Sequence, residues 1–409
     1  MNYGTQAVIK RIDGTSFREF ALFVHDFALL FDGEGKPLNP PEVPGSHDDP
    51  GVMGINYRCE PMRERLKDHS DPAYIFSSLD HGDPATPILE TYPGDEMIIR
   101  LLDGAHEEQH AFNLTGMSWK REIADPASPD VASQTLGISE AFNIRVTKQY
   151  GPGDYLYYFG GSDDVWLGLW GIIRVYDHHR KCLKPLCKER RLPVPPCPGK
   201  NAVIRKYEVA AIQRKLSYNQ HGDHDPNGLM FVPLEEAQAA MHEKYQAKPL
   251  ILRANAGDWI EVTLHNLLDV HNPIEYFDYP TVPLDMPHKP SMRVSLNPHF
   301  LNYDPVCDSG INVGYNNREQ TVEPGESKRY LWYADREYGA CILQSFGDIR
   351  NHRYHGLFGA VIVEPPGAKW YRNFSLSKAM HEEEVVITAP ERISADDAQL
   401  IMPNVYEFV

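Results

Sequence analysis

Short runs of alternating apolar and polar residues recur along most of the chain, separated by glycine and proline. The runs are rich in Val, Ile, Tyr and Phe, and 30 Gly and 33 Pro residues are spread between them. Alternation with a period of two is typical of β-strands, and Gly and Pro mark the turns that join them. The pattern therefore predicts an all-β fold built from many short strands.

One segment departs from this alternation. Residues 233–245, PLEEAQAAMHEKY, are dense in Ala and Glu, and Leu234, Ala237 and Met241 repeat at helical spacing. Ala and Glu are strong helix formers, and apolar residues three and four apart share one helix face. This segment predicts the one clear helix of the chain.

A break in composition lies near the middle of the chain. Residues 177–200, DHHRKCLKPLCKERRLPVPPCPGK, are basic, rich in proline and without alternation. Such a stretch is typical of a connection between domains, and 409 residues suffice for two domains of about 100–200 residues each. We predict a first domain over residues 1–177, a linker over 178–200, a second domain over 201–380 and a C-terminal extension over 381–409.

The two predicted domains repeat one arrangement. YPGDEMIIRLLDG begins at Tyr92 in the first, and NAGDWIEVTLHNL begins at Asn255 in the second, so each has a Gly-Asp turn followed by an alternating strand. Near the end of each domain, GLWGIIRV and GLFGAVIV are close copies that lead into a final apolar strand. Duplication of one β domain explains both pairs.

These closing segments resemble those of cupredoxin domains in the multicopper oxidases, which have a strand, a polar loop, Gly-Leu-aromatic-Gly and a last strand. The resemblance covers nearly the whole chain and includes HGDPATPILETYPGDE at His81, GAHEEQHAFNLTGMSW at Gly104 and RVSLNPHFLNYD at Arg293. It implies two tandem cupredoxin-like Greek-key β-barrels of about eight strands each. It points to large bacterial multicopper oxidases, which string together more such domains than this chain contains.

The resemblance also implies copper, and each ligand position of the family can be checked in this sequence. An O₂-reducing cluster needs four His-x-His pairs, and a blue copper centre adds a cysteine thiolate. This chain has Asn113 and Thr115 at the first position, Tyr158 at the second and Asn297 at the third. At the fourth position, before GLFG, neither register supplies a cysteine. We therefore expect most of the family's copper apparatus, blue copper included, to be missing.

Five histidines are the candidate ligands for a remaining mononuclear copper site. Imidazole binds copper in both oxidation states, and histidines close together in a loop can converge on one ion. The alternative for each of them is an ordinary hydrogen-bonded role. The candidate metal ligands are His106, His110, His299, His352 and His355.

The closing loop of the first domain carries aromatic and acidic groups where the family has copper ligands. Such groups recognise a small cationic or aromatic ligand by stacking and by charge-assisted hydrogen bonds. The same groups also suit a repacked site without activity. The candidate substrate-binding residues are Tyr158, Asp163, Asp164 and Trp166.

Charge limits the partners that we expect. The chain has 40 basic and 57 acidic residues and a formal net charge of −17, which repels nucleic-acid phosphates and anionic lipid. No apolar run approaches the roughly 18 residues of a membrane span. The first residues also lack the apolar run of an export signal, so we expect a cytoplasmic protein with a small-molecule partner.

Three functional hypotheses follow from the sequence. The first is an intracellular oxidoreductase that uses a mononuclear, histidine-ligated copper on a small aromatic or phenolic metabolite. The second is a metal-free cupredoxin-fold protein that binds a ligand, or does non-redox chemistry, in the cleft between the domains. The third is a subunit, as a homo-oligomer or with a partner chain, of a larger oxidase assembly. In the first two we expect His106 and His110 to face His352 and His355.

Overall fold

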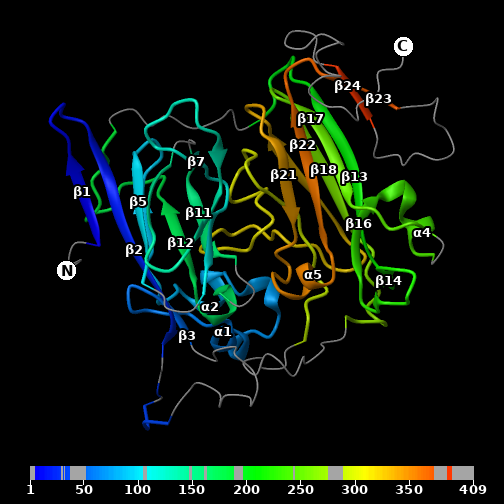
Figure 1. Cartoon of the computed structure of the whole chain (residues 1–409), viewed down its shortest axis with the longest axis horizontal. Coiled ribbons are helices and arrows are strands. Elements are labelled where there is room, and N and C mark those ends of the chain that lie inside the picture. The colour runs from blue at the N-terminus through cyan, green and yellow to red at the C-terminus, as the bar shows by residue number, and fades with distance from the viewer. Residues whose placement is uncertain are drawn as a thin grey trace.

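The chain folds into two β-sandwiches that lie side by side (Figure 1). Strands account for 41% of the structure and helices for 9%, which confirms the all-β prediction. The structure is a computed structural model, and it describes residues 5–28, 31, 33–36, 52–104, 108–146, 150–160, 164–187, 197–242, 245–274, 289–372 and 385–388.

Two five-stranded sheets form the first sandwich. One sheet has the order β1-β2-β5-β10, with β3 also paired to β2, and the other has the order β4-β12-β11-β6-β9. A short pair, β7 and β8, lies apart from them. The strands are β1 (Gln6–Lys10), β2 (Ser16–Ala28), β3 (Val52–Ile55), β4 (Leu89–Thr91), β5 (Met97–Asp103), β6 (His110–Leu114), β7 (Trp119–Lys120), β8 (Asp130–Val131), β9 (Ser133–Leu136), β10 (Ala141–Arg145), β11 (Gly153–Phe159) and β12 (Trp170–Val175).

Two four-stranded sheets form the second sandwich, in the orders β16-β13-β18-β20 and β17-β22-β21-β19. Two further strand pairs, β14 with β15 and β23 with β24, lie outside these sheets. The strands are β13 (Ile204–Gln213), β14 (Leu216–Ser217), β15 (His224–Asp225), β16 (Leu229–Pro233), β17 (Leu250–Asn255), β18 (Trp259–Asn266), β19 (Asn297–Pro298), β20 (Ser327–Tyr333), β21 (Gly339–Gln344), β22 (Phe358–Glu364), β23 (Lys369–Arg372) and β24 (Val385–Thr388).

The two sandwiches share one topology. In each, the long early strand pairs in parallel with the strand after the Gly-Asp turn, β2 with β5 and β13 with β18. In each, the closing strand pairs in parallel with the strand before that turn, β12 with β4 and β22 with β17. The turn glycines, Gly94 and Gly257, have φ of 83° and 95°, a conformation that favours glycine. The strand order is that of two tandem cupredoxin-like Greek-key domains.

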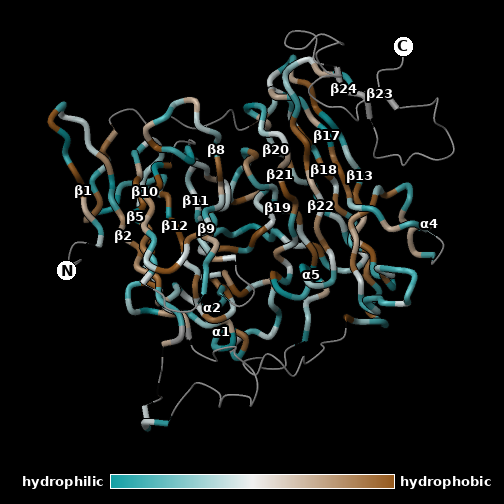
Figure 2. The backbone as a smooth tube through the Cα atoms, viewed as in Figure 1, coloured by the Kyte–Doolittle hydropathy of each residue, from teal (hydrophilic) through white to brown (hydrophobic). Residues whose placement is uncertain are grey.

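Each sandwich encloses its own apolar core. Ile99, Phe112 and Tyr157 belong to the first core, and Val262 and Trp332 belong to the second. Figure 2 shows hydrophobic residues concentrated on strands such as β12, β18 and β22, and hydrophilic residues on the loops. Inward residues alternate with outward ones along β18, as the alternating sequence predicts.

A third apolar cluster joins the two sandwiches, and we call it the junction cluster. It combines side chains of the first domain, such as Tyr158, Trp166 and Trp170, with Phe346 and Ile349 of the second. The Tyr158 and Phe346 rings meet edge to face, with centroids 5.8 Å apart and an interplanar angle of 84°. Such aromatic pairs contribute more than their buried area alone, so the junction is a packed interface.

The helices are short, and several lie near the junction (Figure 1). The expected helix over 233–245 is shorter than its sequence suggests: Pro233 ends β16, and only two turns follow, because Met241 is exposed and has no packing to extend them. None of the helices in the described part of the chain has the length and apolarity to cross a membrane. The helices are α1 (Met62–Asp68), η1 (Pro72–Tyr74), α2 (Ser78–His81), α3 (Asp164–Leu167), η2 (Leu234–Glu236), α4 (Ala237–Ala240) and α5 (Asn351–Tyr354).

The first part of the predicted linker is fastened to the first domain. The Asp95 carboxylate accepts hydrogen bonds from the amides of Leu186 and Cys187, at 2.9 and 3.1 Å. The Tyr92 phenol donates to the Leu183 carbonyl at 2.9 Å. Residues 188–196, and all of the predicted C-terminal extension except 385–388, lie outside the described residues, and the predicted domain limits stay a prediction.

Candidate functional site

His352 lies in α5, in the loop that the resemblance equates with a copper loop. Its imidazole is fully buried and hydrogen bonded on both sides, with Nδ1 2.8 Å from the Ser345 hydroxyl and Nε2 3.0 Å from the Ser291 carbonyl. A carbonyl only accepts, so Nε2 donates to it and Nδ1 accepts from the serine. Burial lowers the pKa of His352, which agrees with this neutral form. Both ring nitrogens of His352 are therefore engaged in hydrogen bonds, and neither is available to bind a metal ion.

The other two candidate ligands of the second domain are tied to different strands. The Nδ1 atom of His355 lies 2.7 Å from the Asp225 carboxylate of β15, and the His355 carbonyl accepts from the Leu229 amide. His299 is half-buried just after β19, and its amide donates to the Ile342 carbonyl. These contacts hold the α5 region and β19 to the second sandwich.

His110 and Asp164 are two candidate site residues that the fold does bring together. The Nδ1 atom of His110, at the start of β6, lies 3.2 Å from the Asp164 carboxylate of α3, and both side chains are fully buried. Burial alone would lower the pKa of His110, but the Asp164 hydrogen bond and the charges of Asp164, Asp103 and Asp26 outweigh it and raise that pKa. His106 and Asp163 lie outside the described residues.

Tyr158 and Trp166 already have cationic partners, which come from the second domain. The Arg353 guanidinium lies over the Tyr158 ring, 5.7 Å from its centroid, and donates to the Tyr158 hydroxyl at 3.4 Å. The Arg350 guanidinium lies 5.1 Å from the Trp166 centroid. Both aromatic side chains are buried. These two candidate binding residues for a cationic or aromatic ligand thus pack against arginines of the same chain, as in the alternative of a repacked site, and their role in binding stays a prediction.

A buried ion-pair network lies beside the junction cluster. The Arg174 guanidinium of β12 contacts both Asp154 and Asp83, at 2.9 and 2.8 Å, and lies 4.5 Å from the Tyr315 ring centroid. Asp154 also accepts from the Tyr315 amide of the second domain at 2.8 Å. At the preceding residue, Gly314, an added Cβ would come within 1.8 Å of the Asp154 carboxylate, so the close approach needs glycine. One arginine therefore links both domains.

Copper does not fit the described part of this junction. Across the described ranges, no group of three or more His, Cys, Asp or Glu side chains could hold a metal ion. His352 uses both ring nitrogens in hydrogen bonds, and at the copper-loop positions Tyr158 and Phe346 pack against Arg353. Because His106 is not described, the predicted ligand set as a whole stays a prediction.

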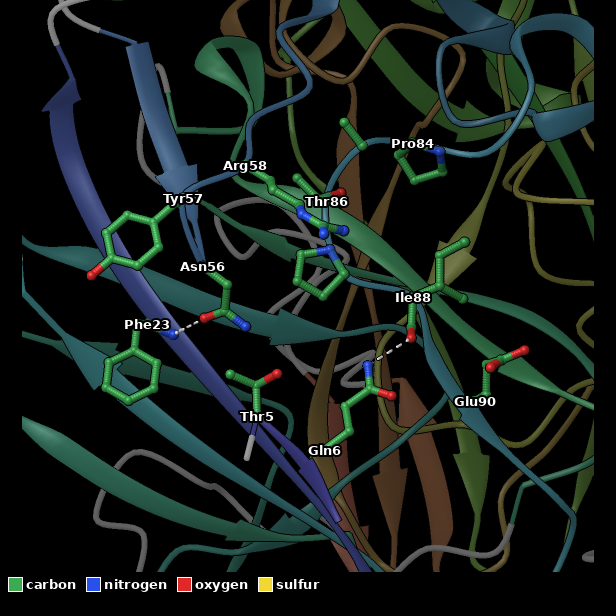
Figure 3. Close-up of a pocket in the computed structure, with 12 residues that line it drawn as sticks. Thr5, Gln6, Phe23, Asn56, Tyr57, Arg58, Pro84, Thr86, Ile88 and Glu90 are labelled. Carbon is green, nitrogen blue, oxygen red and sulfur yellow. Dashed lines mark hydrogen bonds between the residues drawn. The ribbon is translucent and has the colours of Figure 1, made fainter. Parts of the chain in front are cut away.

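A groove of about 820 Å³ opens in the first domain, between the edges of its two sheets (Figure 3). Its lining comes from the start of β1, from Phe23 of β2, from residues 56–58 after β3, and from residues 84–88 with Glu90 of β4. The side-chain amide of Gln6 donates a hydrogen bond to the Ile88 carbonyl at 3.2 Å, which joins two segments of the lining. The volume is in the range of small-molecule sites, about 300–1,000 Å³.

One wall of the groove, residues 84–88, is fixed from behind. The Ala85 amide donates to the Glu60 carboxylate at 2.9 Å, and the Tyr157 phenol donates to the Pro87 carbonyl at 2.6 Å. The Thr86 hydroxyl is buried beside the Tyr157 phenol, yet no hydrogen bond of good geometry reaches it from the described residues. Hydrogen bonds to the Glu60 and Tyr157 side chains therefore hold this wall in place.

The opposite wall is a two-residue hairpin turn in which both central residues are left-handed. Asn56 and Tyr57 have φ of 53° and 63°, as in a type I′ turn. Asn56 suits its position, because its side chain accepts from the Phe23 amide at 2.8 Å and donates to the Ala21 carbonyl at 2.9 Å. Tyr57 stands where glycine is favoured, and 96% of its surface is exposed. The turn therefore holds an aromatic ring at the mouth of the groove.

Two charged groups line the groove, and they differ in their contacts. Arg58 is exposed, and no ion pair or side-chain hydrogen bond reaches it from the described residues. Glu90 accepts from the Tyr176 phenol at 2.5 Å. Sequence reasoning missed this site, because its residues come from four separate segments and match no motif. The one local signal is the Asn-Tyr pair in a turn position.

Comparisons with known proteins add little to what the geometry of the chain shows. No protein-family model matches the chain, and no curated protein matches it. Solved structures found similar include a multicopper oxidase (13% identity, TM-score 0.26, 88% of this chain and 93% of that chain), a copper nitrite reductase from Nitrosomonas europaea (12%, 0.24, 84% and 94%) and a laccase from Botrytis aclada (10%, 0.25, 84% and 63%). TM-scores this low carry no argument about cofactor or activity, so the fold assignment rests on the strand order.

Proposed function

We propose that this protein is a metal-free binding protein that takes up a small aromatic molecule in the groove of its first domain. The observation that carries the proposal is the groove itself, where two aromatic rings and a guanidinium face solvent beside a rigid wall. Concave sites with apolar surface and a few convergent polar groups are the usual form of small-molecule sites. The proposal keeps the metal-free binding hypothesis from the sequence and assigns the ligand to this groove, whereas the interdomain cleft stays a prediction.

Binding suits the groove better than catalysis does. Its described lining contains no His, Cys or Lys, and its carboxylate, Glu90, is engaged with Tyr176. A general acid or base has to reach the substrate proton within hydrogen-bond distance, whereas the one carboxylate of the described lining already accepts from a phenol. Two aromatic rings, Phe23 and Tyr57, line the same groove.

The first experiment tests whether aromatic molecules bind at all. We expect benzyl alcohol, used as a neutral probe, to bind wild-type protein in ligand-observed NMR, and Phe23→Ala to weaken that binding about tenfold, because it removes one aromatic wall. Val8→Ala is the matched control, since Val8 is an equally exposed apolar residue outside the groove. No binding by benzyl alcohol, benzoate or benzylamine would overturn the proposal.

The second experiment separates this proposal from a copper-dependent oxidoreductase acting on an aromatic or phenolic metabolite. We expect purified protein titrated with Cu(II) or Cu(I) to bind no stoichiometric copper and to show no intense absorption near about 600 nm, where Cu–thiolate centres absorb. One tightly bound copper per chain would refute the metal-free proposal. Loss of that copper in His110→Ala would then assign the site to the first domain.

A further inference from the structure

We infer that the groove is built for an aromatic carboxylate, with Arg58 pairing the carboxylate and Tyr57 and Phe23 contacting the ring. This inference rests on the proposed function and names the ligand class of that site. Figure 3 shows the three side chains among the residues that line the groove. The argument has two steps, which concern charge and ring contacts.

The charge step starts from the acidity of the chain. The chain has a formal net charge of −17, and several arginines on the first domain's surface pair with carboxylates: Arg11 and Arg145 both pair with Glu96, and Arg100 pairs with Glu19. Arg58 has no such partner among the described residues. A guanidinium is a planar fork that binds a carboxylate through two parallel hydrogen bonds.

The charged side chains that line the groove indicate the charge of the ligand. Arg58 is the one cationic side chain in the described lining, and Glu90 of β4 adds a negative charge to the same groove. A single cation with a carboxylate nearby favours a ligand with one negative charge over a doubly charged phosphate. A carboxylate is therefore the anion that the groove fits.

The ring step concerns the conformation of Tyr57. A left-handed backbone is unfavourable for a tyrosine and comfortable for glycine, and the strain has to be offset elsewhere. Packing offsets little of it, because Tyr57 is 96% exposed and its ring lies beside the His25 imidazole with centroids 6.1 Å apart. Phe23, 49% exposed, lines the same groove from β2. Contact of a flat ligand with both the Tyr57 and the Phe23 ring explains why the strained turn carries a tyrosine.

The decisive test compares three probes of equal size by calorimetry. We expect sodium benzoate to bind wild-type protein about tenfold more tightly than benzyl alcohol, and benzylamine to bind more weakly than either, because of the Arg58 charge. Arg58→Gln should remove the preference for benzoate while benzyl alcohol still binds, and Arg58→Lys should retain part of it. Arg121→Gln, at an exposed arginine outside the groove, should behave as wild type.

The outcomes separate the inference from the proposed function. Equal affinity for benzoate and benzyl alcohol, or a benzoate preference that survives Arg58→Gln, would overturn the carboxylate inference while leaving aromatic binding in place. Failure of all three probes to bind wild-type protein would overturn both.

A second variant tests the ring step independently. Tyr57→Gly should raise the melting temperature by about 1–3 °C, because it relieves the left-handed strain, and should weaken benzoate binding several-fold, because it removes a ring. Tyr57→Asn, which tolerates the same backbone, should weaken binding to a similar extent. Unchanged affinity in both variants would remove Tyr57 from the site.

Discussion

The junction and the groove are built from the same kinds of side chain, put to opposite uses. At the junction, Arg353 covers the buried rings of Tyr158 and Phe346. In the groove, Arg58 lies with exposed aromatic rings and has no partner among the described residues. The guanidinium and the aromatic rings thus contact each other within the chain at the junction, whereas in the groove they face solvent.

The difference teaches how to interpret such clusters in this fold. An arginine over an aromatic ring gains more when both groups are desolvated, so buried pairs stabilise the structure and exposed ones contribute little. The junction residues are therefore expected to govern stability, and the groove residues to govern binding. Four predictions test this division, from the largest expected effect to the smallest.

The largest effect is expected from Arg174→Ala at the junction. The change leaves the buried Asp154 carboxylate without its guanidinium partner, and breaking a buried ion pair from one side costs about 3–5 kcal/mol. Urea unfolding measures the loss. Arg329→Ala, which breaks an exposed pair with Glu261, is the control and should cost less than about 1 kcal/mol. Equal losses in the two variants would contradict a special role of the junction.

The second largest effect is expected from His352→Ala. The free energy of unfolding should fall by about 1–3 kcal/mol, because Ser345 and Ser291 lose their buried hydrogen-bond partner. Copper affinity should not change. Thermal melts together with copper titration make the measurement, and His271→Ala, at an exposed histidine, is the control. A stable variant that loses a bound copper would instead identify His352 as a ligand.

A pH dependence should come from His110. Its pKa is raised in the folded state, so its stabilisation is complete below about pH 6.5 and is lost as the pH rises through the folded-state pKa, by about 1.4 kcal/mol per unit of pKa difference. Asp164→Asn should flatten this decline. His352, whose pKa is lowered, loses stability only as the pH falls below about 6.5. Burial raises the pKa of the Cys59 and Cys307 thiols, which lose stabilisation only near and above about pH 8.5, so unfolding measured from about pH 6.5 to 8 reports mainly on His110. A flat wild-type profile there would contradict the prediction.

The smallest effect is expected in the groove wall. Thr86→Val removes a buried hydroxyl that has no well-formed hydrogen bond, so the free energy of unfolding should stay within about 1 kcal/mol of wild type or rise slightly. Chemical unfolding measures it. A loss above about 2 kcal/mol would mean that the Thr86 hydroxyl is hydrogen bonded to Tyr157 in the folded protein.

The sequence predicted those parts of the structure that depend on local pattern. Alternation marked the strands, and the two Gly-Asp turns marked the repeat, because Gly94 and Gly257 need a left-handed backbone that other residues resist. It also singled out His110 and Asp164, which do meet. It did not predict their pairing, which depends on how α3 packs against β6.

The features that escaped prediction depend on contacts between distant segments. Arg353 lies 195 residues beyond Tyr158, so nothing near the tyrosine indicates that its ring is already covered. His352 was a candidate ligand because it stands in a polar loop, whereas the serines that bind it come from the residue after β21 and from the chain before β19. The groove, likewise, exists only once β1, β2 and β4 converge.

The parallel pairing that closes each sandwich has a consequence for synthesis on the ribosome. Leu89 of β4 pairs with Ile173 of β12, so this sheet closes only after both strands have been synthesised. Pairing between residues so far apart in the sequence makes folding slow. Even then, the Tyr158 ring lacks its edge-to-face partner and its cationic neighbour until Phe346 and Arg353 emerge, nearly two hundred residues later. During that interval the nascent first domain exposes part of its junction face, which favours chaperone binding and disfavours expression of this domain by itself.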